Sequence, residues 1–186
     1  RFRNVTGVQT CALPIYKNLD VGEGTSKANT AILHTGFDAK PGTLESKLVS
    51  KGYFLLKDHA RATGIAVEET GALLVAWNQE ELDSFPELIT KAKANGYQAV
   101  KEISKDELYR IEPNLGAGAL GALLIPDEFV IDPWSTTLSY ALQGEALGVK
   151  FILGDEVTGI VKNHNRCTVK AGSSSYEADW VINAAG

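Results

Sequence analysis

The stretch EGTSKANTAILHTG, from Glu23 to Gly36, decides how the rest of the sequence is interpreted. It combines two glycines, four small hydroxyl residues, an asparagine and a histidine, and its only charges are those of Glu23 and Lys27. Such a segment makes a poor hydrophobic core and a poor solvated loop. Free backbone amides and hydroxyls are instead the groups that hold a polyanionic ligand close to the chain. We therefore interpret this segment as part of an anion-binding cradle.

The stretch WVINAAG, from Trp180 to Gly186, gives a second indication of the same kind. An apolar strand that runs into small residues and stops at glycine is how many nucleotide-binding crossovers begin. Each stretch is a weak signal alone, but the two together, in this order, favour a nucleotide-binding protein.

We expect the first fifteen residues to differ in origin from the rest of the sequence, the alternative being a short natural apolar arm or a truncated signal sequence. Residues 5–15, VTGVQTCALPI, match the in-frame translation of what looks like a common DNA sequencing adapter. We therefore treat residues 1–15 as an artefact and exclude them from the fold prediction, as one excludes a fusion scar. We also expect the remaining sequence to be a fragment of a longer protein.

Composition excludes several classes of function. The content of 44% hydrophobic and 22% charged residues is ordinary for a globular protein. Setting aside Arg1 and Arg3 from the 18 basic residues leaves 16 against 23 acidic ones, a net charge of −7. No basic stripe is therefore expected that could bind the phosphates of a nucleic acid. No apolar run approaches the roughly 18 residues of a membrane span, so we predict no transmembrane segment.

The cysteines and histidines predict neither a disulfide nor a metal site. With Cys11 discounted, Cys167 is the one remaining cysteine and can form no internal disulfide. A reducing cytoplasm is the default location for such a chain, and peripheral attachment to a membrane stays open as an alternative. The histidines, His34, His59 and His164, lie far apart and lack cysteine or carboxylate ligands at metal-binding spacing.

Local signals predict the helices of the first half. Thr43, after Pro41-Gly42, is the N-cap of a helix that ends at Gly64. One stripe of this helix is expected to face the core, and it consists of Leu44, Leu48, Leu55, Leu56, Ala60 and Thr63. After a β run within 67–77, the Asn78-x-x-Glu81 signature starts the next helix. Pro86 should make this helix kink or restart at Ser84 before it stops at Asn95-Gly96.

The second half is predicted as short helices and strands of a mixed α/β layout. Strands are expected at 97–103, 121–125 and 129–131, the last continuing the sheet after a turn at Pro126-Asp127. Helices are expected from the Ser104 cap to Ile111 and from Asp132-Pro133 to Gly148. Further strands are expected at 149–153, 156–162, 167–171, 176–178 and 180–183. Residues 16–65 and 132–186 are predicted as parts of one nucleotide-binding domain, with 66–131 as part of a second, inserted domain.

Six motifs carry a resemblance to a known family. They are GTSKANTAILHTGFDAKPGTL (24–44), TGALLVAW (70–77), RIEPNL (110–115), IDPW (131–134), GDEVTGI (154–160) and WVINAAG (180–186). In these motifs and their order, the sequence resembles the FAD-dependent oxidoreductases of the D-amino-acid oxidase superfamily. It looks most similar to the FAD-dependent glycerol-3-phosphate dehydrogenases and to their neighbours, the L-2-hydroxyglutarate oxidases. The resemblance implies a partial Rossmann-type FAD-binding domain with an inserted mixed-sheet substrate domain, without the N-terminal G-x-G-x-x-G fingerprint.

The resemblance also implies roles for individual residues. Gly24, Thr25 and Ser26 would lie along the pyrophosphate and ribityl chain of FAD, and Asn29 and Thr30 would approach the flavin. His34 and Gly36 would sit near the isoalloxazine ring. Val157 would contact the adenine through its backbone. The chain would return to the dinucleotide at Ala184, Ala185 and Gly186.

Two side chains are candidates for catalysis or substrate binding. Flavin chemistry needs an oriented substrate and the removal of one proton, and a histidine has a pKa suited to that proton. His34 is therefore either the base or substrate hydrogen-bond partner, or it only packs against or hydrogen-bonds the flavin. Lys27 either pairs with an anionic substrate or phosphate, or is simply solvated.

The first functional hypothesis is oxidation of a small anionic alcohol, with glycerol 3-phosphate as the leading substrate. Oxidation of L-2-hydroxyglutarate and oxidation of an amine or amino acid are the enzymatic alternatives. The non-catalytic alternative is a flavin-binding subunit that transfers electrons. The partners implied are a small anionic substrate and an electron-accepting protein or quinone, and the fragment alone is expected to bind FAD poorly and to be inactive.

Overall fold

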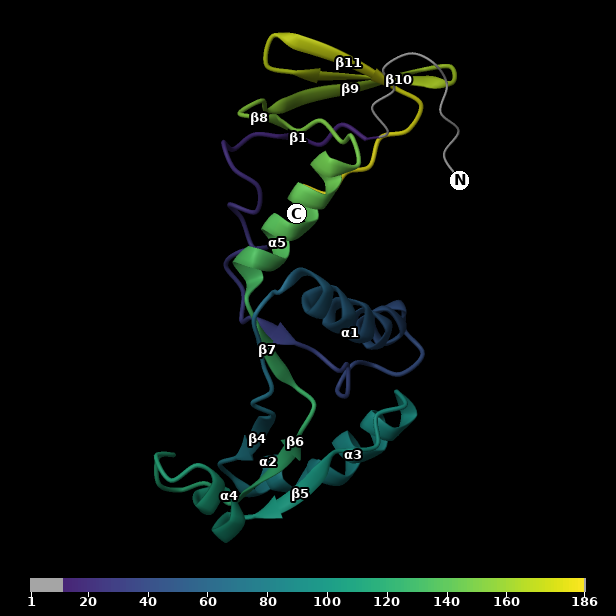
Figure 1. Cartoon of the computed structure of the whole chain (residues 1–186). Coiled ribbons are helices and arrows are strands. Elements are labelled where there is room, and N and C mark those ends of the chain that lie inside the picture. The colour runs from purple at the N-terminus through teal and green to yellow at the C-terminus, as the bar shows by residue number, and fades with distance from the viewer. Residues whose placement is uncertain (1–11, 186) are drawn as a thin grey trace. The chain divides into compact units, whose positions relative to one another are not determined.

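The computed structural model describes residues 12–185. The chain divides into two compact units, of which one consists of residues 30–132 and the other of the segments before and after that range. Both units contain helices and strands (Figure 1). The predicted mixed α/β class is therefore confirmed.

The first sheet of the 30–132 unit is built around a strand late in its sequence. Strand β7 (Phe129–Ile131) pairs antiparallel with β2 (Ile32–Leu33) on one side and with β3 (Val67–Glu68) on the other. The pairing of Leu33 with Phe129 and of Val67 with Ile131 sets the register. Three segments distant in sequence thus meet at β7.

Helix α1 (Leu44–Thr63) covers this sheet, and its ends are those that the sequence predicts. The Thr43 hydroxyl accepts a hydrogen bond from the Ser46 amide, and Gly64 ends the helix in the left-handed conformation. Tyr53 and Ala60 are buried against Leu33 and its β7 neighbours, with Leu56 packed beside them.

The predicted buried stripe of α1 is wrong in four of its six members, one of which is Thr63, exposed at the end of the helix. Leu44, Leu48 and Leu55 are exposed by 57–71% of their surface. The helix offers apolar residues on more than one face, and the sheet of β2 and β7 covers only the face of Tyr53 and Ala60.

A second sheet forms the other half of this unit, in the order β4 (Ala72–Ala76), β6 (Gly121–Ile125) and β5 (Lys101–Ser104). Both faces of the central β6 are buried, which explains its uninterrupted apolar sequence. Leu123 and Ile125 pack with Phe85 of α3 (Phe85–Ala94), while Ala122 packs with Leu108 of α4 (Lys105–Ile111).

Two strand predictions in this unit need correction, whereas the β run expected within 67–77 is confirmed as β4, which follows Gly71 (φ +68°) and the short β3. The strand expected at 97–103 forms only at 101–104. Strand β7 does not continue the sheet of β6, because the turn at Pro126 and Asp127 sends it to β2 and β3. The restart at Ser84 is confirmed, since α2 (Gln79–Asp83) ends there and α3 begins.

The other unit contains a parallel strand pair, one long helix and a three-stranded meander (Figure 1). Strand β1 (Ile15–Tyr16) pairs parallel with β8 (Ile152–Leu153), so the pair includes Ile15, the last residue that we excluded as adapter. Helix α5 (Pro133–Ala146) begins at the predicted proline. The meander consists of β9 (Val157–Asn163), β10 (Arg166–Ala171) and β11 (Ser174–Ala178).

The predicted strand at 180–183 is absent among the described residues, which have no regular structure from 179 to 185. Trp180 and Ile182 are each 88% exposed there. A strand forms only where a neighbour takes up its amides and carbonyls, and no described strand pairs with this segment. Within residues 12–185, no helix combines the length and the apolar character that a membrane crossing requires.

Two glycines, one inside α1 and one directly after its last residue, should respond in opposite directions to replacement by alanine. At Gly64, φ is +72°, so Gly64→Ala should lower the free energy of unfolding by about 1 kcal/mol. Gly52 lies inside the helix, and an added Cβ there meets no atom within 4 Å. Gly52→Ala should therefore raise the free energy of unfolding by about 0.5–1 kcal/mol. Urea unfolding of the two variants measures both values, and a shift in the same direction would contradict the assigned helix end.

Candidate functional site

A buried carboxylate lies beside His34. The Glu128 side chain is only 3% exposed, whereas 47% of the His34 side chain is exposed. One carboxylate oxygen, Oε2, lies 3.2 Å from Nδ1 of His34. The other, Oε1, accepts hydrogen bonds from both the backbone amide and the hydroxyl of Thr35, each at 2.7 Å. Each carboxylate oxygen therefore has a partner within the protein.

Strand pairing explains why these residues meet. Leu33 lies opposite Phe129 in the β2–β7 pair, so His34 and Glu128, the next residue of one strand and the preceding residue of the other, come together. The turn before β7 is fastened by Tyr97, whose hydroxyl donates to Asp127 Oδ2 at 2.9 Å and accepts from the Asp127 amide at 3.3 Å. The Glu128 amide also donates to the carbonyl of Ile125.

His34 and Glu128 each shift the pKa of the other. The hydrogen bond with Glu128 raises the pKa of His34, and this effect outweighs the opposing effect of burial. Burial opposes ionisation of Glu128, but the hydrogen bonds from His34 and Thr35 outweigh it and lower the pKa of the carboxyl. The carboxylate is thus held ionised.

The loop after Thr35 is fixed by one asparagine. Nδ2 of Asn95 donates to the carbonyls of Gly36, Phe37 and Ala39 at 2.7–3.3 Å. Gly36 has φ of +79°, and a Cβ there would lie 3.2 Å from Ser50 Oγ and from Val49 Cγ1. Gly36 is therefore required by the backbone, and its contact with a cofactor stays a prediction.

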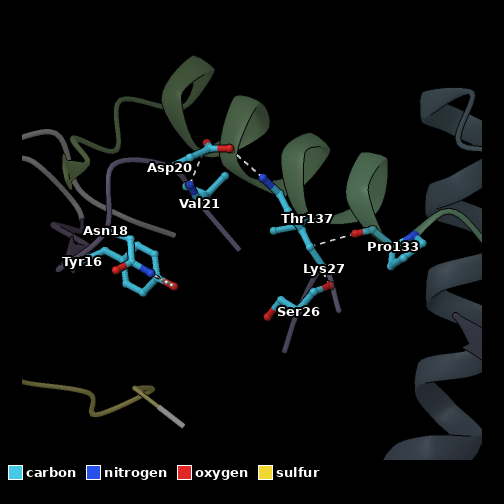
Figure 2. Close-up of polar contacts among 8 residues, drawn as sticks. All are labelled: Tyr16, Asn18, Asp20, Val21, Ser26, Lys27, Pro133 and Thr137. Carbon is cyan, nitrogen blue, oxygen red and sulfur yellow. Dashed lines mark hydrogen bonds and ion pairs between the residues drawn. The ribbon is translucent and has the colours of Figure 1, made fainter. Parts of the chain in front are cut away.

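In the other unit, Lys27 is not simply solvated, and its pairing with an anionic substrate or phosphate stays a prediction. Its ammonium lies 2.7 Å from Asp20 Oδ2 and 5.0 Å from the centre of the Trp134 ring. The Lys27 side chain is only 9% exposed. Figure 2 shows Lys27 directed at Asp20 beside α5, with Asp20 also accepting from the Val21 amide. The lysine is therefore neither solvated nor without a partner.

The residues around Lys27 form a turn with exposed donors. Ser26 offers its carbonyl to the Thr137 hydroxyl at 3.2 Å, which ties the turn to α5 (Figure 2). The side-chain amide of Asn29 donates to the carbonyls of Thr25 and Ser26, so Asn29 shapes the turn from within. Gly24, Thr25 and Ser26 are exposed, as are Asn29 and Thr30.

This turn fits the pyrophosphate of a dinucleotide in its donor chemistry. Exposed hydroxyls of Thr25 and Ser26, with neighbouring backbone amides, are the groups that bind phosphate oxygens. A Cβ on Gly24 would approach only Tyr16 Oη, at 3.9 Å, so packing within the chain does not account for the glycine. The contact of Gly24 with the cofactor stays a prediction.

The predicted site residues are divided between the two units. Thr30, His34 and Gly36 belong to the 30–132 unit, and the other described candidates belong to the second one. Among these, Val157 begins β9, and Ala184 and Ala185 lie exposed in the irregular 179–185 segment. Gly186 lies outside the described residues. No group of three or more metal-ligating side chains occurs within residues 12–185.

Sequence reasoning missed Glu128, Asp20 and Asn95. The only local signal for Glu128 was an acidic residue directly before an apolar strand, which also describes an ordinary turn. Its importance follows from Thr35, its hydrogen-bond partner 93 residues away, which no local pattern shows.

Comparisons with known proteins agree on one family. A family model described as FAD dependent oxidoreductase matches residues 15–186. The chain is 33% identical over 172 residues to a glycerol 3-phosphate dehydrogenase of Caloramator mitchellensis, covering 92% of this chain and 36% of that relative. It is 26% identical over 170 residues to an L-2-hydroxyglutarate dehydrogenase of Indibacter alkaliphilus, covering 91% of this chain and 42% of the relative.

A solved structure shares the fold. The L-alpha-glycerophosphate oxidase from Mycoplasma pneumoniae with FAD bound matches with a TM-score of 0.82 and 25% identity, covering 87% of this chain and 43% of that one. The chain therefore spans less than half of the length of these three proteins.

The ion pair of His34 and Glu128 predicts how stability depends on pH. Because its pKa is raised, His34 contributes stability fully below its ordinary value of 6.5, and the contribution is lost as pH rises through the raised pKa. Because its pKa is lowered, Glu128 contributes stability above its ordinary value of 4.5, and this is lost as pH falls through the lowered pKa. The pair should therefore stabilise the fold most between these two values.

Urea unfolding of the wild type and of His34→Asn across pH 4–9 measures this dependence. The wild type should lose more stability than His34→Asn between neutral and alkaline pH. His164→Asn is the matched control, because His164 lies in the β9–β10 turn of the other unit. Equal slopes for the wild type and His34→Asn would contradict the ion pair.

Proposed function

Because this chain belongs to the DAO family of FAD-dependent oxidoreductases, we propose that the protein containing it oxidises a small anionic alcohol, with glycerol 3-phosphate as the leading substrate. The support for this substrate is the 33% identity to a glycerol 3-phosphate dehydrogenase across 92% of the chain. In this proposal the cofactor contacts are those predicted from the sequence, with the Gly24–Ser26 turn on the pyrophosphate.

The observation that carries the proposed chemistry is the half-exposed imidazole of His34, anchored on a buried carboxylate. Oxidation of an alcohol removes a hydride from the carbon and a proton from the hydroxyl, and leaves a carbonyl product. Bound FAD supplies the acceptor for the hydride. His34 takes the hydroxyl proton and releases it to solvent after the product has left.

Lys27 remains the proposed contact for the anionic group of the substrate. Its ammonium already pairs with Asp20, so in this role it exchanges the carboxylate for the substrate anion. Electrons are proposed to pass on to a partner protein or a quinone, with the protein in the cytoplasm or at a membrane surface.

A second substrate has specific support. The similarity to an L-2-hydroxyglutarate dehydrogenase, at 26% identity over 91% of the chain, favours an L-2-hydroxy acid as the alternative. The two substrates share an alcohol and an anionic group, so the same base serves both.

Anaerobic bleaching of the flavin in the intact protein tests the substrate. Glycerol 3-phosphate should bleach the flavin, whereas L-2-hydroxyglutarate, glycine and L-proline, added separately, should not. Bleaching by L-2-hydroxyglutarate alone would select the alternative, and bleaching by an amino acid alone would reject both. A protein that purifies without flavin, or whose flavin only dithionite bleaches, would contradict the proposed activity.

The base is tested by His34→Asn in the same assay. The rate constant of flavin reduction should fall about 10²- to 10⁴-fold, the usual contribution of a positioned base. His164→Asn should leave the rate constant unchanged. Bleaching of His34→Asn by dithionite confirms that its flavin is bound, so that a slow reaction with substrate reports the missing base.

A further inference from the structure

Glu128 is a buried charge that the proposed chemistry does not yet use. A carboxylate removed from water is costly unless it is paired and hydrogen-bonded. Glu128 meets this condition through three donors, namely the amide and hydroxyl of Thr35 and Nδ1 of His34. Only His34 reaches from this cluster towards solvent, since Thr35 and Glu128 are both buried.

We propose that Glu128 is a positioning residue that keeps the proton of neutral His34 on Nδ1 and so leaves Nε2 as the atom that accepts the substrate proton. This inference rests on the proposed function, because it assigns the atom of the base named there. It adds Glu128 and Thr35, neither of which the sequence reasoning assigned to the site.

The choice of nitrogen follows from the donors and acceptors present. A neutral imidazole has one N–H and one lone pair, and an ionised carboxylate can only accept. The Thr35 amide can only donate, so Oε1 of Glu128 acts as an acceptor there. Because the carboxylate is ionised, Oε2 is also only an acceptor. Nδ1 of His34 must therefore carry the hydrogen that points at Oε2. The lone pair then belongs to Nε2.

Thr35 makes the carboxylate a fixed acceptor. Its two hydrogen bonds to the same oxygen, each 2.7 Å long, prevent the carboxylate from turning away from His34. The backbone that carries these side chains is held by the pairing of β2 with β7 and by Tyr97 on the preceding turn. The carboxylate that orients the imidazole is therefore itself held in place by hydrogen bonds and strand pairing.

The charged groups around His34 identify a matched control. Glu128 and Asp38 are the acidic groups that act on His34. Near Glu128 lie Tyr53 and Tyr97, whose pKa values are raised, and the acidic residue Asp127 directly before it. Glu128 and Asp38 both raise the pKa of His34, but only Glu128 does so through a hydrogen bond. Asp38→Asn therefore removes a nearby charge without affecting the position of the imidazole hydrogen.

The first test is direct observation of the imidazole. Two-dimensional ¹H–¹⁵N NMR of the ¹⁵N-histidine-labelled protein, with His34→Asn used to assign the signal, distinguishes a protonated Nδ1 from a protonated Nε2. The neutral His34 of the wild type should carry its proton on Nδ1, and a proton on Nε2 would overturn the proposal. This measurement needs neither substrate nor turnover, so it stands apart from the proposed function.

The second test is the pH profile of flavin reduction. In the wild type, kcat/KM should rise with pH as His34 loses its proton. Glu128→Gln should move this rise to lower pH, because the carboxylate no longer stabilises the imidazolium. It should also lower kcat at the plateau about 10²- to 10⁴-fold with little change in KM, because the amide can hold the wrong tautomer and Glu128 does not touch the substrate.

Asp38→Asn should keep the plateau value of kcat, which distinguishes the loss of a nearby charge from the loss of the correct tautomer. Thr35→Val keeps Glu128 and should lower kcat in the same direction but by less, so it replaces Glu128→Gln if that variant does not fold.

An unchanged plateau and pH profile in Glu128→Gln, with His34→Asn inactive, would overturn the role of Glu128 and leave the proposed function intact. If His34 carries its proton on Nδ1 but the protein oxidises no substrate of the panel, the proposed function is overturned and the positioning by Glu128 stands.

Discussion

The position of β7 between β2 and β3 is the constraint on which the 30–132 unit depends. Its three residues bring together segments that are about 35 and 60 positions apart in sequence, and their inward side chains close the core beneath α1. The turn that leads into β7 also delivers Glu128, and the segment that leaves β2 delivers His34. The same pairing that builds the sheet thus builds the candidate site, so the two cannot be altered independently.

Hydrogen bonds from neighbouring groups offset the free-energy cost of burying the ionised carboxylate of Glu128. A buried glutamate without partners would take up a proton, since desolvation favours the neutral form. Hydrogen bonds from Thr35 and His34 reverse that preference at Glu128. Lys27 shows a related solution in the other unit, where an ammonium with little exposure lies between Asp20 and the face of Trp134. In both places a charge is retained in the protein together with a specific partner.

The features that could be predicted from the sequence are those encoded by neighbouring residues. The caps Thr43, Asn78 and Ser104 and the stop at Gly64 depend on contacts within four residues, and all of them are confirmed. The face of α1 that is buried depends on where β2 and β7 pair, so exposed Leu48 and buried Tyr53 could not be told apart by periodicity. Of the candidate site, His34 was identified from its residue type and the family resemblance, whereas Glu128 required the tertiary structure.

The single amide of Asn95 has a consequence for the chemical lifetime of the protein. Three carbonyls of the 36–39 segment depend on its two hydrogens, and the next residue is Gly96. Asparagine is a thermolabile residue, and hydrolysis of its amide would replace a donor by a carboxylate facing those carbonyls. In the folded chain the Gly96 amide donates to the carbonyl of Lys93, which withholds it from attack on the asparagine side chain. The fold therefore protects the side-chain amide of Asn95, which holds the 36–39 segment. Deamidation of Asn95 should proceed mainly from molecules in which this region has opened locally.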